Sequence, residues 1–140
     1  MSKVDVLLKA FDNENNEFIL QHNSKDIRKK KLNILKEIHL EDEKIEEFMN
    51  KLEDYIYIDE MQEVISGSFI RWIPLKDPEN IKLTKGATVC DLNLCNKGCL
   101  IICKNFRNTH MQIKIEECLI FRKMTEQEKV LLSAMNYLTK

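Results

Sequence analysis

The chain has 140 residues, of which 44% are hydrophobic and 32% charged, and its formal net charge is -1. This composition is typical of a globular domain and excludes a disordered chain, because the apolar surface is sufficient to offset the conformational entropy lost on folding. The near-zero net charge excludes a globally basic nucleic-acid binder, and the absence of a run of about 18 to 20 apolar residues predicts no membrane span.

Residues 1–56 are predicted to be mainly helical. Residues 4–11 fit a short helix or a strand equally well. Apolar residues at helical spacing predict a helix that starts at Lys25, with Ser24 as its N-cap. A second helix is predicted by the cleanest periodic run of the chain, which consists of Ile45, Phe48, Met49, Leu52, Tyr55 and Ile56. The short connection between the two helices predicts an antiparallel hairpin.

Residues 57–123 are predicted to be β-rich. Strand-like runs at 68–75, 87–94, 99–104 and 111–121 follow one another closely, with turn-forming residues between them. Such closely spaced strands predict a curled antiparallel sheet or a small β-barrel.

Residues 124–140 are predicted to form a C-terminal helix. Thr125 and Glu128 have the spacing of a capping box, in which each side chain bonds the other residue's backbone amide. The fold class is therefore predicted to be α+β, with all 140 residues in a single domain.

The five cysteines are predicted to be free thiols. Their number is odd, and the N-terminus lacks the long apolar run of a secretory signal, which favours an intracellular protein in a reducing compartment. Cys90, Cys95, Cys99 and Cys103, with His110 close behind, raise the alternative of a zinc site. Their spacing is not that of paired zinc knuckles, so we predict no metal.

No catalytic or cofactor-binding motif is found in the sequence. The three glycines do not match the spacing of a phosphate-binding loop or of a dinucleotide-binding motif, and the sequence contains no nucleophile elbow. His22, His39 and His110 are interpreted as surface or capping residues. We therefore predict a protein that is not an enzyme and has no cofactor, while an enzyme with an unrecognised site stays an alternative.

Two sets of residues suggest contact with nucleic acid. The first is a basic patch at Arg28, Lys29, Lys30 and Lys31. The second is a mixture of aromatic and basic residues of the kind that stacks bases in small barrels. Its members are Arg71, Trp72, Lys104, Phe106 and Arg107.

The segments 67–75, 83–89 and 118–128 are similar to segments of small uncharacterised proteins of large nucleocytoplasmic DNA viruses. The resemblance covers about the C-terminal half of the chain. It implies a component of the virion or virus factory that acts through contacts, and it assigns no catalytic residue. A viral protein of this kind would lie in the host cytoplasm or the virion.

The sequence thus favours a non-enzymatic interaction or structural module, with a protein partner, either a second copy or another chain. A small β-barrel that binds nucleic acid is the alternative.

Overall fold

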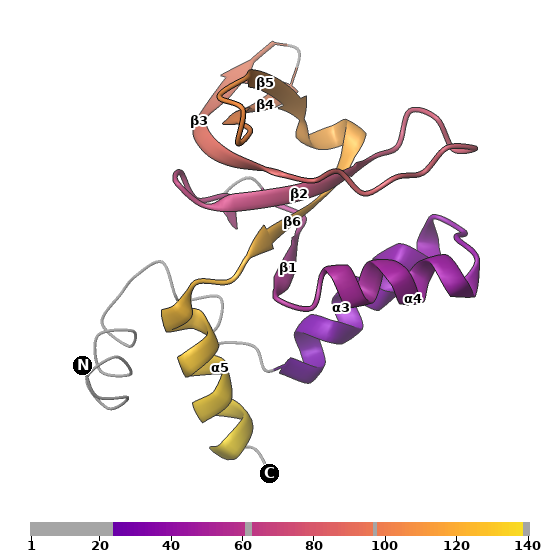
Figure 1. The fold of residues 1–140 in the computed structure, drawn as a ribbon, viewed down its shortest axis with the longest axis vertical. Coiled ribbons are helices and arrows are strands. Elements are labelled where there is room, and N and C mark those ends of the chain that lie inside the picture. The colour runs from indigo at the N-terminus through magenta and orange to yellow at the C-terminus, as the bar shows by residue number, and fades with distance from the viewer. Residues whose placement is uncertain (1–23, 61–62, 97, 139–140) are drawn as a thin grey trace. The chain divides into compact units, whose positions relative to one another are not determined.

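The computed structural model describes residues 24–60, 63–96 and 98–138 (Figure 1). These residues form three α-helices and a six-stranded antiparallel sheet, which confirms the α+β class. The chain divides into two compact units. The helical unit contains the described residues up to Glu53 and those from Met124 onward, and the sheet unit is Asp54–Lys123. The single domain over 1–140 stays a prediction, and the expectations for residues 4–11 and for His22 lie outside the described residues.

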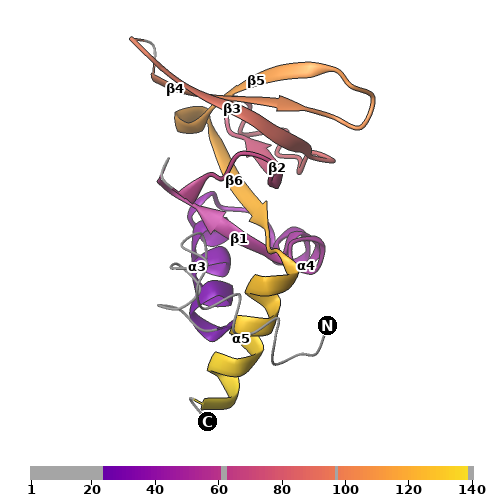
Figure 2. The same cartoon turned by 90° about the vertical axis from the view of Figure 1, so that its left-hand side faces the viewer.

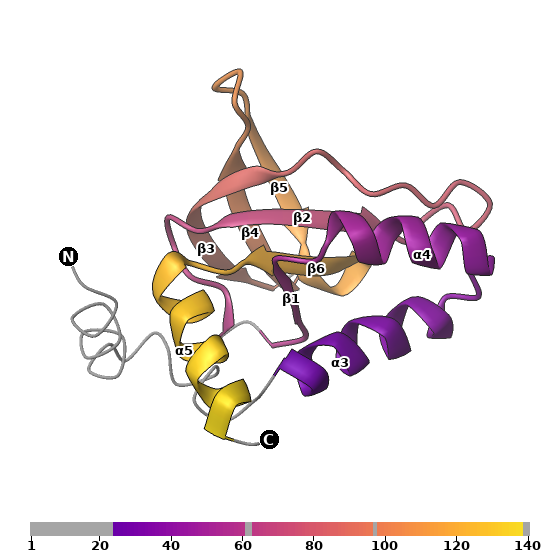
Figure 3. The ribbon, with the colours of Figure 1, turned by 60° about the horizontal axis from the view of Figure 1, so that its bottom comes forward.

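The helical unit consists of α3 (Ser24–Glu37), α4 (Asp42–Lys51) and α5 (Glu126–Leu138). Helices α3 and α4 lie side by side as a hairpin (Figure 3), as their short connection predicts. The buried positions of each helix are three or four residues apart, because one stripe of each helix faces the interior, and the middle buried position of α3 is Lys31. The buried apolar residues are Ile27 and Leu35 on α3, and Ile45 and Phe48 on α4.

Helix α4 ends earlier than its hydrophobic pattern predicts. Tyr55 and Ile56 continue the helical spacing, but they belong to strand β1 (Tyr55–Ile58). The Lys31 ammonium donates hydrogen bonds to the carbonyl oxygens of Leu52, at 2.8 Å, and Glu53, at 3.4 Å. A cation on these carbonyls stabilises the negative end of the helix, and the residues that follow, Tyr55–Ile58, pair with residues 120–123 in the sheet.

Helix α5 begins with the predicted capping box. The Glu128 amide donates to the Thr125 hydroxyl at 3.1 Å, and the Thr125 amide donates to the Glu128 carboxylate at 3.0 Å. Near the other end, Asn136 binds Ser24 through both its amide nitrogen and its amide oxygen. Ser24 is the first residue that the structure describes, so its predicted role as the N-cap of α3 stays a prediction.

The sheet unit is an open, curled sheet with the strand order β1-β6-β2-β3-β4-β5 (Figure 2). Strands β2 to β5 form a meander, and β6 returns to lie between β1 and β2. Among the described residues β1 and β5 form the two ends of the sheet, so the predicted alternative of a closed barrel is wrong. The other strands are β2 (Phe69–Pro74), β3 (Ala87–Cys95), β4 (Gly98–Lys104), β5 (His110–Lys114) and β6 (Cys118–Lys123).

The predicted strand over 111–121 is two strands. A single 3-10 turn, η3 (Ile115–Glu117), separates β5 from β6, because β5 pairs with β4 and β6 pairs with β1 and β2. The Glu116 carboxylate accepts a hydrogen bond from the Cys99 amide at 3.1 Å, which fixes η3 against the start of β4. This hydrogen bond lowers the pKa of Glu116.

One face of the sheet carries the hydrophobic core of this unit. Side chains alternate between the two faces of a strand, so β4 buries every second residue. Gly86 enters β3 at φ +100°, where a Cβ atom would lie 2.6 Å from the carbonyl oxygen of Ile70. Only glycine fits this close approach. The core residues are Ile58, Val64, Ile70, Trp72, Ala87, Val89, Ile101, Cys103, Ile113 and Ile120.

The capping box predicts a measurable contribution to stability. Replacing Thr125 by Ala removes the hydroxyl that accepts from the Glu128 amide and should lower the free energy of unfolding by about 1 kcal/mol. Thr125→Ser keeps the hydroxyl and should retain most of this stability. Urea denaturation followed by circular dichroism measures both changes, and equal losses in the two variants would contradict the prediction.

The Lys31 ammonium makes a second prediction. Lys31→Met keeps most of the aliphatic stem but leaves the Leu52 carbonyl without this donor, so unfolding should become easier by about 1 to 3 kcal/mol. Lys29→Met on the exposed side of the same helix is the control and should change stability by less than about 0.5 kcal/mol. Equal destabilisation by both substitutions in thermal unfolding would show that the buried ammonium has no special role.

Candidate functional site

The turn between β4 and β5 is held in one conformation by Asn105. Its side-chain oxygen accepts hydrogen bonds from the backbone amides of Arg107, at 2.9 Å, and Thr109, at 3.0 Å. The backbone amide of Asn105 donates to the backbone carbonyl of Thr109, and the backbone amide of Asn108 donates to the backbone carbonyl of Asn105. Asn108 has a positive φ of 64°, a left-handed backbone conformation that Asn tolerates better than most residues. The turn therefore presents residues 106 and 107 on a fixed backbone.

Phe106 and Arg107 form the hairpin tip. The Phe106 side chain is 76% exposed, one of the largest exposures of any apolar side chain in the described residues. The Arg107 guanidinium carbon lies 5.9 Å from the centre of the Phe106 ring, within the range of a cation–π contact. An aromatic ring and a guanidinium thus reach solvent together, at the end of a turn that projects from the sheet (Figure 3).

The outer face of the β4–β5 hairpin, opposite the core, carries polar and cationic side chains together with the apolar residues Leu100 and Ile102. Lys104 pairs directly with His110, and Leu100 pairs with Lys114. Side chains of directly opposed residues project on the same face of a sheet, and so do residues two and four positions along. The face therefore carries Lys104 and His110 next to the tip and Lys114 further away. Lys114 also forms an ion pair with Glu117 at 3.8 Å.

The part of the chain that builds this hairpin is locally basic, although the whole protein is not. From residue 80 to residue 115 the only acidic residue is Asp91. Asp91 is exposed on β3, where it pairs with Ile102. The six cationic residues of this stretch are Lys82, Lys85, Lys97, Lys104, Arg107 and Lys114.

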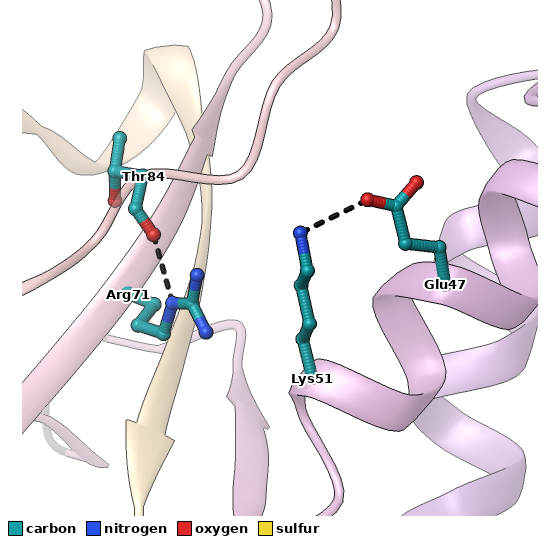
Figure 4. Close-up of polar contacts among 4 residues, drawn as sticks. All are labelled: Glu47, Lys51, Arg71 and Thr84. Carbon is teal, nitrogen blue, oxygen red and sulfur yellow. Dashed lines mark hydrogen bonds and ion pairs between the residues drawn. The ribbon is translucent and has the colours of Figure 1, made fainter.

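Two of the five predicted nucleic-acid contacts do not lie on this surface. Trp72 is 8% exposed and belongs to the core, so its ring is not available to stack on a base. Arg71 is half-buried on β2, and its Nε donates to the Thr84 carbonyl at 2.8 Å (Figure 4). The structure brings Lys104, Phe106 and Arg107 together on one hairpin and places Arg71 and Trp72 elsewhere in the sheet.

The predicted basic patch on α3 is divided between the surface and the interior. Arg28 and Lys29 are exposed and Lys30 is half-buried, whereas Lys31 is 3% exposed and binds the end of α4. At about 100° per residue, the exposed residues Lys25, Lys29 and Lys36 fall within about 40° of one another. These three exposed cations of α3 therefore lie along one side of the helix, and only Lys29 among them belongs to the predicted patch 28–31.

One acidic residue of α4, Glu47, forms an ion pair at the surface. Glu47 binds Lys51 one turn later at 2.9 Å (Figure 4), and this hydrogen bond lowers the pKa of Glu47. A carboxylate with a lowered pKa stays ionised at neutral pH and is a poor general acid.

The thiols lie in different environments. Cys90 is exposed, Cys99 and Cys103 are buried on one face of β4, and Cys118 is half-buried. Burial raises the pKa of Cys103 and of Cys118 to about 11. Within the described residues no three His, Cys, Asp or Glu side chains come close enough together to hold a metal ion. The side chain of Cys95 lies outside the described part of the chain.

Sequence reasoning missed two residues of the hairpin. Asn105 positions the tip, and its signal is local, since Asn residues at the start of turns commonly bond backbone amides two residues on. His110 has no such signal, because only the register places it beside Lys104.

The comparisons with known proteins add no further assignment. No protein-family model matches the chain, and no curated protein or solved structure matches it. None of the helices in the described residues is long and apolar enough to cross a membrane.

The thiol environments predict an order of reactivity. The thiolate is the reacting form, so Cys103 and Cys118 should alkylate slowly at pH 8 because their pKa is raised and their side chains are covered. Cys90 should react before either of them because it is exposed. Timed iodoacetamide labelling with peptide mass spectrometry measures each site, and rapid modification of folded protein at Cys103 would contradict the assignment.

Proposed function

We propose that the protein is a non-enzymatic interaction module and that its contact surface is the β4–β5 hairpin. The observation that carries the proposal is the exposed Phe106 ring beside Arg107 on a turn fixed by Asn105. Exposing a large apolar ring forgoes burial worth about 1.5 to 3 kcal/mol, so a partner that covers it would gain this free energy.

The rigidity of the tip supports a binding role. Binding costs conformational entropy for each side chain and loop that becomes ordered. The turn already holds its backbone through the bonds of Asn105, so little of that cost would fall on the protein. Aromatic residues and arginine are also the residue types that most often dominate binding energy at interfaces.

The position of β5 at one end of the described sheet extends the contact surface. The outer backbone groups of an end strand are available for pairing with a further strand, although charged side chains discourage indiscriminate pairing. Lys114 on this strand is of that kind. The surface therefore combines an apolar anchor with polar surroundings, as protein contact sites do.

The chemistry of the other reactive side chains supports a role without catalysis. The Cys103 and Cys118 thiols have a raised pKa and stay protonated at neutral pH, which disfavours nucleophilic catalysis. The viral resemblance of residues 67–75, 83–89 and 118–128 is compatible with a component of the virion or virus factory, and this assignment and an intracellular location are part of the proposal.

Position-specific photo-crosslinking tests the proposed surface. A benzophenone amino acid in place of Phe106, incorporated in the cells that make the protein, should give covalent adducts on irradiation. The same amino acid in place of Tyr137, an aromatic that is 78% exposed on α5, should give far fewer.

A second control separates the tip from the rest of the sheet. Leu94, which is 71% exposed on β3, should also give few adducts when replaced in the same way. Adducts at Phe106 that disappear when Arg107 is also changed to Ala would support a contact made by the tip. No adducts at Phe106, or equal yields at all three positions, would rule out the hairpin as the contact surface.

A further inference from the structure

We infer that the ligand of the β4–β5 hairpin is a single-stranded nucleic acid, with an unpaired base on Phe106 and the phosphate backbone along the outer face. This inference rests on the proposed function and names the partner of the same surface.

The tip supplies a stacking platform. Proteins that bind single strands without sequence preference stack bases on exposed aromatic rings, because every base has a π-face. The Phe106 ring is 76% exposed, and Arg107 at 5.9 Å adds a planar cation that itself stacks on bases and binds phosphate. The ring and the guanidinium therefore offer one base and its adjoining phosphate two neighbouring contacts.

The outer face supplies the charges that follow the backbone. Lys104 projects from the strand residue nearest the turn, and Lys114 lies four residue positions away in register, about 13 Å along the strands. Within the described residues no ion pair engages the side chains of Lys104 and Arg107. Phosphates would therefore not have to displace a carboxylate from either cation.

The local charge favours a polyanion over a protein segment. Residues 80–115 contain six Lys and Arg residues against Asp91 alone, and three of these cations, Lys104, Arg107 and Lys114, lie on the hairpin, where Lys114 pairs with Glu117. A concentration of one sign of charge on one surface is typical of nucleic-acid contact sites. The apolar tip then selects among polyanions, because stacking requires bases that are not already paired in a duplex.

Fluorescence anisotropy of the full-length protein tests the inference. The probes are a labelled mixed-sequence DNA strand of about 15 nucleotides, the same strand annealed to its complement, and a labelled oligoglutamate peptide of similar length. The single strand should bind more tightly than the duplex and the peptide. With Lys104 and Arg107 in contact with phosphates, its affinity should fall roughly sevenfold between about 50 mM and about 200 mM salt.

Matched variants locate the binding. Phe106→Ala should weaken single-strand binding about 5- to 150-fold, whereas Leu94→Ala, which also removes an exposed apolar side chain, should leave it unchanged. Arg107→Ala should weaken binding and should lower by about one the number of counterions released on binding, which is measured from the slope of log affinity against log salt concentration. Lys29→Ala on α3 removes an equal charge from another surface and should have no effect.

The inference is overturned if the single strand does not bind at low salt, or if Lys29→Ala weakens binding as much as Arg107→Ala. Tighter binding of oligoglutamate, with the same dependence on Phe106, would also overturn it and would identify an acidic protein segment as the ligand. In that case, or if crosslinking at Phe106 captures only protein, the hairpin remains an interaction surface. Absence of position-specific adducts would instead remove the proposed function itself.

Discussion

The sheet depends on the position of β6 between β1 and β2. This strand pairs on both sides, with Tyr55–Ile58 and with Phe69–Pro74, and it buries Leu119, Ile120 and Phe121. The pairing joins strands that lie far apart in the chain, so the sheet cannot be completed until residue 123 has been added. Contacts of this sequence separation carry a large loop-closure cost, which the buried apolar residues offset.

Because β6 occupies the interior of the sheet, the meander of β2 to β5 extends away from it and ends at β5. One face of this meander supplies the core, and the other carries Lys104, His110 and Lys114. The proposed contact surface is therefore a consequence of strand alternation: residues that the core does not use are grouped on a single face. Asn105 then fixes the tip through short-range hydrogen bonds and does not depend on the rest of the fold.

Some features were predictable because they depend on neighbours in sequence. The capping box of Thr125 and Glu128 and the turn at 105–109 involve residues three or four positions apart, and both are confirmed. Other predictions failed where a distant residue decides the outcome. The helical spacing continues through Tyr55 and Ile56, yet these residues form β1 because they pair with β6, and Lys31 binds the carbonyls of Leu52 and Glu53 at the end of α4. The run 111–121 is predicted as one strand, but its first part pairs with β4 and its last part pairs with β2.

The sequence alone determined the fold class, most strand positions and three members of the candidate surface, Lys104, Phe106 and Arg107. These follow from local periodicity and composition, which act over a few residues. Only the tertiary structure decided that Trp72 and Lys31 are buried, that Arg71 bonds the Thr84 carbonyl, and that His110 lies beside Lys104. Each of these depends on strand register or on packing between distant segments, and a cationic or aromatic side chain has the same local signal whether it reaches solvent or the interior.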